Sequence, residues 1–221
     1  MTFQRARSEE QREIRRRAIL DAAAAMLDEM PVADLSLNEL SRRVGLAKSN
    51  VLRYFDSREG VLLELMDAVL QDWLAQLAGD LAAGIDAGSP LVRRAEQLSA
   101  VLARSLAERP VLCDLAGAQG GVLERNVTAD VVRRHKRTAL TRLAAGADLL
   151  RRYVPELGEA AEVFCFHALV LAGALAPYSS PPPGVRAAYE AEPELAVLHA
   201  DLRDSLQRAI RTLLLGAVPR D

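Results

Sequence analysis

Residues 36–59 read SLNELSRRVGLAKSNVLRYFDSRE, and this stretch predicts two short helices joined by a tight turn. Ser36 is placed to cap the first helix, and Glu39, three residues later, can complete a capping box. Gly45 should end that helix, because glycine accepts the left-handed backbone of a C-terminal cap. The second helix is expected to start near Ala47 and to be polar and basic on its outer face. Such a pair is typical of a helix-turn-helix, whose second helix enters the DNA major groove.

The part from residue 45 to residue 59 resembles the turn, the recognition helix and the start of the fourth helix of the tetracycline-repressor (TetR) family of bacterial transcriptional regulators. Outright matches to the family pattern are Gly45, Lys48, Phe55, Ser57 and Glu59. Two positions depart from the pattern, because the usual tyrosine, a phosphate contact in the family, is Leu52 and the usual histidine is Tyr54. The resemblance implies a one-component DNA-binding regulator, most often a repressor that a small-molecule effector releases from a palindromic operator.

Position and resemblance together assign roles on DNA. The backbone at the start of the first helix can donate to a phosphate, and polar side chains of the second helix point into the groove, where Asn favours adenine and Arg favours guanine. The predicted DNA-binding residues are Ser36, Asn38, Lys48, Ser49, Asn50, Arg53, Tyr54 and Arg58. Arg42 and Arg43 are equally consistent with a solvated helix face.

Composition favours an all-α protein. Half of the 221 residues are apolar and only 4% are aromatic, while Ala, Leu and Arg dominate. These residue types favour helix over strand. The net charge is −2, yet residues 1–20 hold six arginines against three glutamates, and residues 40–58 hold five cations against one aspartate. Positive charge is therefore concentrated where DNA phosphates would lie.

The helical pattern divides the chain into two predicted domains. Residues 1–56 form the helix-turn-helix domain, in which residues 1–8 are a mobile basic arm and the first helix opens at Ser8. Residues 57–221 form a helical-bundle domain for ligand binding and dimerisation, beginning with a long helix to about Ala83. Three consecutive prolines predict a stiff loop over 177–184, and one last helix is expected over 193–215.

Two apolar helices in the second domain are candidates for a homodimer interface. The helix expected over 159–176 is apolar nearly all round, so every side of it needs cover, and the last helix has a regular leucine face. Core packing within one subunit would explain the same pattern. A palindromic operator requires a two-fold dimer, however, and the resemblance implies the same. The predicted interface residues are Phe166, Val170, Gly173, Leu202, Leu206, Ile210 and Leu213.

A ligand pocket is expected within the second domain. The candidate lining residues are Trp73, Leu102, Cys113, Leu115, His135, Tyr153 and His167. Each of them alone is more commonly a core or surface residue, and the basic run 133–137 is first of all a solvated helix surface. An apolar lining suits an unidentified small effector that is hydrophobic or weakly polar.

Other functional classes find little support. The three histidines fall on different helices, so no metal site and no cofactor is expected. The chain has no nucleophile elbow and no phosphate-cradling glycine loop, which argues against an enzyme. The two cysteines sit in apolar contexts and imply no disulfide framework. With no signal peptide and a buried rather than membrane-spanning apolar helix, the protein is expected to be cytoplasmic. The alternative is a helical small-molecule binding protein or enzyme with no role on DNA, and DNA binding separates the two.

Overall fold

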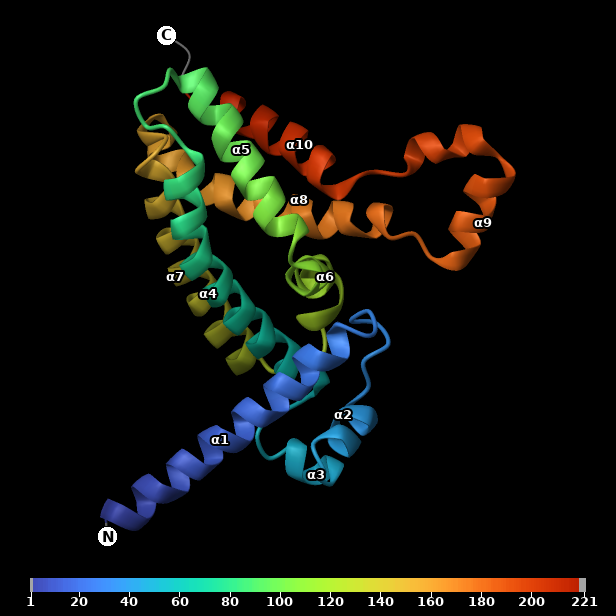
Figure 1. Cartoon of the computed structure of the whole chain (residues 1–221). Coiled ribbons are helices and arrows are strands. Elements are labelled where there is room, and N and C mark those ends of the chain that lie inside the picture. Colours follow the sequence, from blue (N-terminus) through green and yellow to red (C-terminus); the bar gives the residue numbers. More distant parts are fainter. Residues whose placement is uncertain (1, 219–221) are drawn as a thin grey trace.

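The computed structural model describes residues 2–218, with side chains from residue 9 onward, and every regular element in that range is a helix (Figure 1). The predicted all-α fold is therefore confirmed. The elements are α1 (Thr2–Leu27), α2 (Leu37–Arg43), α3 (Lys48–Val51), α4 (Arg58–Gly84), α5 (Leu91–Ala107), α6 (Pro110–Ala118), the π-helix η1 (Gln119–Leu123), α7 (Ala129–Arg151), the 3-10 helix η2 (Pro155–Ala160), α8 (Ala161–Ser179), α9 (Pro183–Ala191), the 3-10 helix η3 (Pro193–Leu198) and α10 (Leu202–Ala217).

The small N-terminal head consists of α1, α2 and α3. The Oγ of Ser36 accepts a hydrogen bond from the Glu39 N–H at 3.2 Å, and Gly45 turns the chain with φ +65°. The second helix starts after Ala47, as predicted. Leu40 is fully buried in the core beneath these helices. The capping box is only half formed, because the Glu39 carboxylate turns to neighbouring arginines and not back to the helix start.

The first helix is longer than predicted. It begins at Thr2, whereas we expected a mobile arm before a helix start at Ser8. No glycine or proline interrupts residues 2–27, and the Arg, Glu and Ala residues there are good helix formers. Figure 1 shows the N-terminal part of α1 projecting away from the body of the molecule.

The body is a bundle of the longer helices around an aliphatic core. Ser57 caps α4 by accepting the Gly60 N–H at 3.0 Å, and α4 then packs against α1 of the head and against α5, α6 and α7. The helix α8 packs against α6, α7 and α10, while α10 lies along α5. Residues 155–179 are long and apolar enough to cross a membrane by length and composition alone. In this fold the same segment is η2 followed by α8, and α8 packs against α6, α7 and α10 on one side while Val163, Phe166 and Val170 stay exposed.

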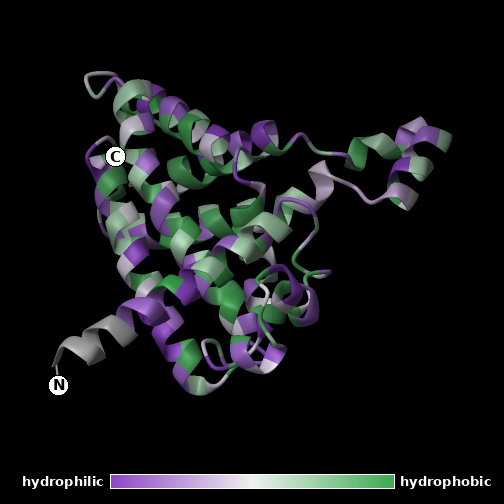
Figure 2. Cartoon of the chain, turned by 60° about the horizontal axis from the view of Figure 1, so that its bottom comes forward, coloured by the Kyte–Doolittle hydropathy of each residue, from purple (hydrophilic) through white to green (hydrophobic). Residues whose placement is uncertain are grey.

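Two predictions about the C-terminal third are wrong. The loop expected over 177–184 is limited to residues 180–182, because Pro177 lies inside the last turn of α8 and Pro183 opens α9. Pro177 has no N–H to bond the Gly173 carbonyl, and α8 ends two residues later, whereas a proline in the first turn costs no hydrogen bond. The single helix expected over 193–215 is split, since η3 ends at Leu198 and Asp201 caps α10 by accepting the Asp204 N–H at 2.8 Å. In Figure 2 the segment with α9 and η3 stands clear of the bundle.

Candidate nucleic-acid interface and effector cavity

The outer face of α3 is a polar surface held in place by two buried side chains. Val51 and Phe55 are packed in the core of the head, which leaves the rest of α3 and the following turn facing solvent. The exposed polar residues there are Lys48, Ser49, Asn50 and Arg53, and Leu52 is exposed beside them. Neither Lys48 nor Arg53 forms an ion pair with any residue between 9 and 218. These four side chains are free to contact a nucleic acid.

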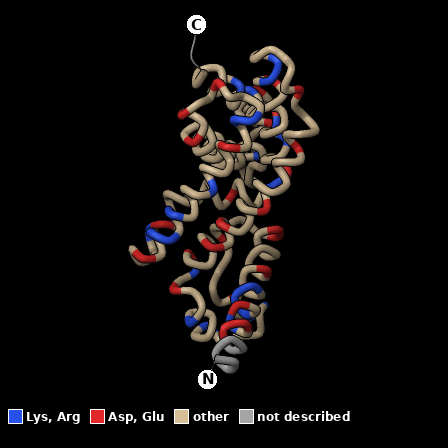
Figure 3. Tube along the Cα trace, turned by 90° about the vertical axis from the view of Figure 1, so that its left-hand side faces the viewer, with Lys and Arg blue, Asp and Glu red and all other residues tan. Residues whose placement is uncertain are grey.

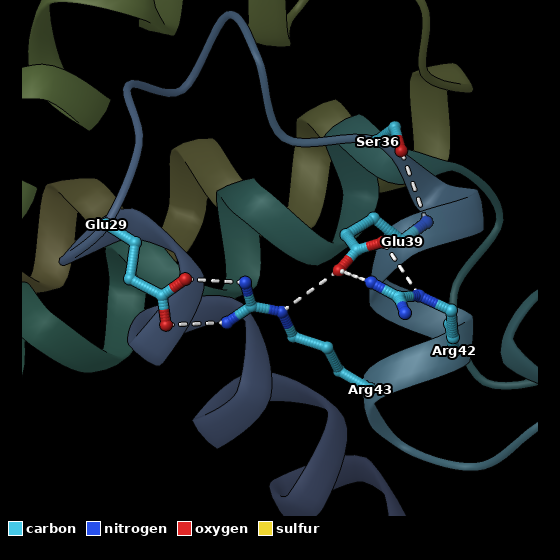
Figure 4. A network of polar contacts seen from close by, with 5 residues as sticks. All are labelled: Glu29, Ser36, Glu39, Arg42 and Arg43. Atoms are coloured by element: carbon cyan, nitrogen blue, oxygen red, sulfur yellow. Dashed lines mark hydrogen bonds and ion pairs between the residues drawn. The ribbon is translucent and has the colours of Figure 1, made fainter.

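The two arginines at the end of α2 are neutralised, in contrast to those of α3. Figure 4 shows Arg43 held by Glu29, with Nη1 and Nη2 at 2.8 and 2.6 Å from its carboxylate, and Arg42 held by Glu39 at 2.7 Å. These hydrogen bonds hold the pKa of both carboxyls below the usual range. The structure therefore favours the solvated helix face for Arg42, whose side chain is 78% exposed, and both arginines are paired with glutamates.

A groove of about 940 Å³ runs between α1 and α3. Arg12 and Arg15 line its α1 side, and Asn50 and Arg53 line its α3 side. Basic side chains thus converge on one groove from two helices, and Figure 3 shows blue segments interleaved with red ones at this end of the tube. The sequence indicated the charge of residues 1–20 but not that Arg12 and Arg15 would stand beside the recognition helix.

Arg16 is a structural residue that sequence reasoning missed. Its guanidinium donates to the backbone oxygen of Tyr54 at 2.5 Å, pairs with Glu64 of α4, and lies 4.5 Å from the centre of the Phe55 ring. A planar cation can stack on an aromatic face while its edge forms hydrogen bonds. Arg16 therefore fixes the end of the recognition helix against α1 and α4.

The predicted DNA contact by Arg58 is wrong in this structure. Its side chain is only 18% exposed and turns into the head, where it donates to the backbone oxygens of Leu35, at 2.5 Å, and Val32. The N–H of Val32 in turn donates to the Asp114 carboxylate of α6 at 2.6 Å. Arg58 of α4 and Asp114 of α6 therefore both bind Val32 and connect the head to the body there.

Three predicted DNA residues remain. Ser36 and Asn38 are exposed at the start of α2, and Tyr54 is half-buried beside the α1–α3 groove. Their roles on DNA stay predictions.

The body contains a cavity of about 420 Å³ between α4, α7 and α8. Its walls are mainly apolar, and its polar lining residues are Asp67, Gln119, His135, Lys136 and Glu162. Mostly apolar walls with a few polar groups are typical of small-molecule sites. An adjoining apolar cavity shares Leu70, Leu143 and Leu169 with it, but has room for only about 30 Å³, about the share of one water.

His135 is the buried polar centre of the larger cavity. Its Nε2 lies 3.0 Å from the Gln119 amide nitrogen, which must donate, so the ring proton is assigned to Nδ1. Nδ1 is 2.9 Å from Asp67 Oδ1 but is not aligned for a hydrogen bond. Asp67 belongs to α4, and Gln119 begins the π-helix η1. This side chain therefore contacts α4, which also packs against the head, and η1, which directly follows α6.

The predicted pocket residues do not form one site. His135 lines the larger cavity, whereas Trp73 and Leu102 line the small apolar one. Cys113 and Leu115 are fully buried in α6, and His167 is exposed on α8. Tyr153 is half-buried, and its backbone oxygen accepts from Arg94 at 2.7 Å. Burial raises the pKa of the Cys113 thiol to about 11.

The predicted dimer residues also separate into two groups. Leu206 and Ile210 are fully buried against the subunit's own helices, and Gly173 packs against the backbone of Gly117, so these three have no surface left for a partner. The periodicity marked a buried face correctly, but the neighbouring helices α5 and α6 cover it. Phe166 and Val170 remain 48% and 47% exposed, and Leu202 and Leu213 are half-buried.

Comparison with known proteins identifies the family. The sequence model "Bacterial regulatory proteins, tetR family" matches residues 19–65, and "Tetracyclin repressor-like, C-terminal domain" matches residues 67–221. The chain is 40% identical over 53 residues to the HTH-type transcriptional regulator EthR of Mycobacterium tuberculosis (strain ATCC 25618 / H37Rv), which is 24% of each chain. It is 34% identical over 76 residues to the HTH-type transcriptional regulator BetI of Burkholderia thailandensis, covering 34% of this chain and 39% of BetI. These matches therefore span less than half of either relative.

Solved structures share the fold across nearly the whole chain. The fatty acid degradation regulator FadR of Bacillus halodurans superposes with a TM-score of 0.52 at 14% identity, covering 91% of this chain and 98% of that one. FadR of Bacillus subtilis, solved in complex with stearoyl-CoA, gives 0.52 at 13% identity with the same coverage. The two family matches cover both the head and the body, so the chain belongs to the TetR family of DNA-binding bacterial transcriptional regulators.

Proposed function

We propose that this regulator is a cytoplasmic homodimer that represses its target by binding a palindromic operator and leaves it when a small effector binds. The observation that carries the DNA-binding part is the charge arrangement of the head. Lys48 and Arg53 are exposed and without ion pairs in the described part of the chain, whereas Arg42 and Arg43 are neutralised by glutamates. Within the described head, positive charge without an ion pair therefore lies on α3 and the turn after it, and Arg53 shares a groove with Arg12 and Arg15 of α1.

In the bound dimer, two copies of α3 would enter successive major grooves, about 34–36 Å apart. Arg53 and Asn50 are the side chains suited to reading base edges, Arg to guanine and Asn to adenine. Lys48 is suited to a phosphate. Arg12 and Arg15 would add phosphate contacts from α1, and each neutralised phosphate makes the affinity fall with salt.

The test uses a matched pair of arginine variants. Fluorescence anisotropy would measure binding to the DNA upstream of the protein's own gene and to a random duplex. Arg53→Ala should lower the preference for the operator by about 5- to 150-fold, the equivalent of about 1–3 kcal/mol. Arg42→Ala removes an arginine that is already paired with Glu39, so it should leave the preference nearly unchanged.

Equal losses in the two variants would contradict the proposed base-reading role of Arg53. No salt-sensitive binding of the unaltered protein to any duplex in a screened library would contradict DNA binding itself. In that case a small-molecule binding protein without a role on DNA would replace the proposal.

The proposed effector site is the cavity of about 420 Å³ between α4, α7 and α8. Its walls favour a compact hydrophobic or weakly polar molecule, and His135 with Gln119 offers it a hydrogen-bonding pair. The shared side chains Leu70, Leu143 and Leu169 would let a longer molecule extend into the adjoining apolar space. An effector would act by binding one arrangement of α4 better than the other, since only differential affinity shifts an equilibrium.

A thermal-shift screen of small hydrophobic acids, amides and alcohols tests this site. A ligand at a hundred times its Kd should stabilise the protein by about 2.7 kcal/mol. Leu140→Trp, at the cavity edge, should abolish the shift by filling the space, while Val92→Trp on the distant end of α5 should not. A shift that persists in Leu140→Trp would place the ligand elsewhere.

A further inference from the structure

The segment that contains α9 and η3 is an arm whose two helices bury no residue against their own subunit. We define the arm as residues 180–200. Its base is closed where the Ala200 N–H donates to the backbone oxygen of Tyr178 at 3.3 Å, and the Tyr189 and His199 rings meet edge-on inside it. No residue of α9 or η3 is buried. Figures 1 and 2 both show the arm standing away from the bundle.

The arm presents apolar side chains to solvent. Val197 is 85% exposed and Leu198 61%, and Val185 and Leu195 are also exposed. Short helices are held in proteins mainly by the burial of an apolar face. An arm of two short helices with an uncovered apolar edge therefore calls for a contact outside its own subunit.

A second exposed apolar surface, which could receive the arm, lies at the N-terminal half of α8. Leu140 of α7 and Val163, Phe166 and Val170 of α8 are exposed, and together they line the mouth of the cavity described above. Exposed contiguous apolar surface of this kind is a mark of a protein contact.

Charge also matches between the two surfaces. Arg134 and Arg137 of α7 are exposed and form no ion pair with residues 9–218. The arm carries Glu190, Glu192 and Glu194 against the single Arg186. An acidic arm and a basic helix beside an apolar mouth are complementary in sign.

We propose that the arm of one subunit lies across the α7–α8 surface of a second copy of this chain. Val197 and Leu198 would pack on Leu140 and Phe166 of that copy, and the arm's glutamates would face its α7 arginines. This inference rests on the proposed homodimer. The effector cavity would then be closed by the partner's arm, so that the site is complete only in the dimer.

In a two-fold dimer, the arm of one subunit can reach the α7–α8 surface of the other. The 19 residues of α8 span about 28 Å at the helical rise. When α8 packs on its copy in the opposite direction, its C-terminal end meets the N-terminal half of the other helix. The arm starts directly after that end, whereas its pinned base holds it away from the Val163 end of its own α8.

Site-directed cross-linking tests the proposal on the full chain. In a Cys165→Ala background, one chain carries Val197→Cys and a second, longer tagged chain carries Leu140→Cys, and a short bismaleimide is added to the mixture. The expected product contains one chain of each length. A matched control replaces Leu140→Cys by Val92→Cys, which is exposed on α5 and should give no product.

Sedimentation of the same samples separates this inference from the proposed dimer. A dimer that gives no product between positions 197 and 140, or gives as much with position 92, overturns the arm placement alone. A monomer overturns the dimer and the arm together.

Charge reversal gives a second, independent readout. Replacing all three arm glutamates by lysine should weaken the dimer about tenfold at low salt. Adding Arg134→Glu and Arg137→Glu should restore it. Unchanged affinity in the first variant, or no restoration in the second, counts against the charge pairing.

Discussion

Gly173→Ala should destabilise the subunit, although helix propensity alone predicts the reverse. Gly173 lies inside α8, where alanine is favoured over glycine by about 1 kcal/mol. A Cβ placed there would lie 2.4 Å from the Gly117 nitrogen and 2.8 Å from its Cα. The clash is with backbone, so no side chain can turn aside, and α6 and α8 must separate by about 1 Å to restore a normal contact distance near 3.4 Å.

Overpacking of this kind costs about 1–3 kcal/mol, and a backbone clash belongs at the upper end. After the propensity gain, the net loss is about 2 kcal/mol. For a chain of 221 residues, an unfolding entropy of about 2.1 cal/mol/K per residue converts this loss into a Tm lower by about 4 °C.

Gly79→Ala is the matched control. Gly79 is also inside a helix, α4, but a Cβ there meets nothing within 4 Å. It should therefore raise Tm by about 2 °C through propensity alone. Both variants would be unfolded by heat, followed by circular dichroism at 222 nm, at several protein concentrations.

The Gly173→Ala loss should not depend on protein concentration, because the contact lies within one subunit. A Tm equal to that of Gly79→Ala would refute the close helix contact. A loss that grows on dilution would instead restore Gly173 to a dimer interface.

Three further outcomes follow from other contacts. Burial raises the pKa of the Cys165 thiol to about 12, so iodoacetamide at pH 8 should alkylate it at least about a hundredfold more slowly in the native protein than in urea, as read by mass spectrometry. The hydrogen bond from Arg94 holds the pKa of Glu156 below its usual value of 4.5, so this pair stabilises the protein at neutral pH and the contribution is lost as the pH falls through that depressed value. Glu156→Gln should therefore cost about 1 kcal/mol at pH 7 in a urea titration and less at pH 3, and equal losses would contradict the pairing. Asp114→Ala should cost about 1–2 kcal/mol and speed exchange of the Val32 amide proton, whereas Asp114→Asn, which keeps an acceptor, should do neither to the same extent.

The parts of the structure that sequence predicted well are those decided by local chemistry. The Ser36 cap and the Gly45 turn depend on residues within one or two turns of helix, and both are confirmed. The buried positions Val51 and Phe55 follow from spacing in the same way. Once Val51 and Phe55 are assigned to the core, the other positions of α3 are predicted to be exposed.

The parts that sequence missed depend on partners far along the chain. Arg58 was expected on DNA because it begins a helix in a basic region, but the carbonyls that receive it lie 23 and 26 residues earlier. Leu206 and Ile210 show that an apolar period identifies a buried face without identifying what buries it. The run of prolines predicts a break after α8, and one occurs over residues 180–182, but the pattern does not show that Pro177 and Pro183 fall inside helix ends.

Val32 has a mechanical consequence for how the head can move. Its carbonyl accepts a hydrogen bond from Arg58 of α4, and its N–H donates one to Asp114 of α6. Two helices of the body therefore bind the same short segment of the head. A segment with one attachment can pivot about it, whereas the position of Val32 depends on both helices. If α4 and α6 shift together, the head is carried along without rotating. If one helix slides past the other, the two contacts pull the Val32 segment in different directions, and the head turns relative to the body.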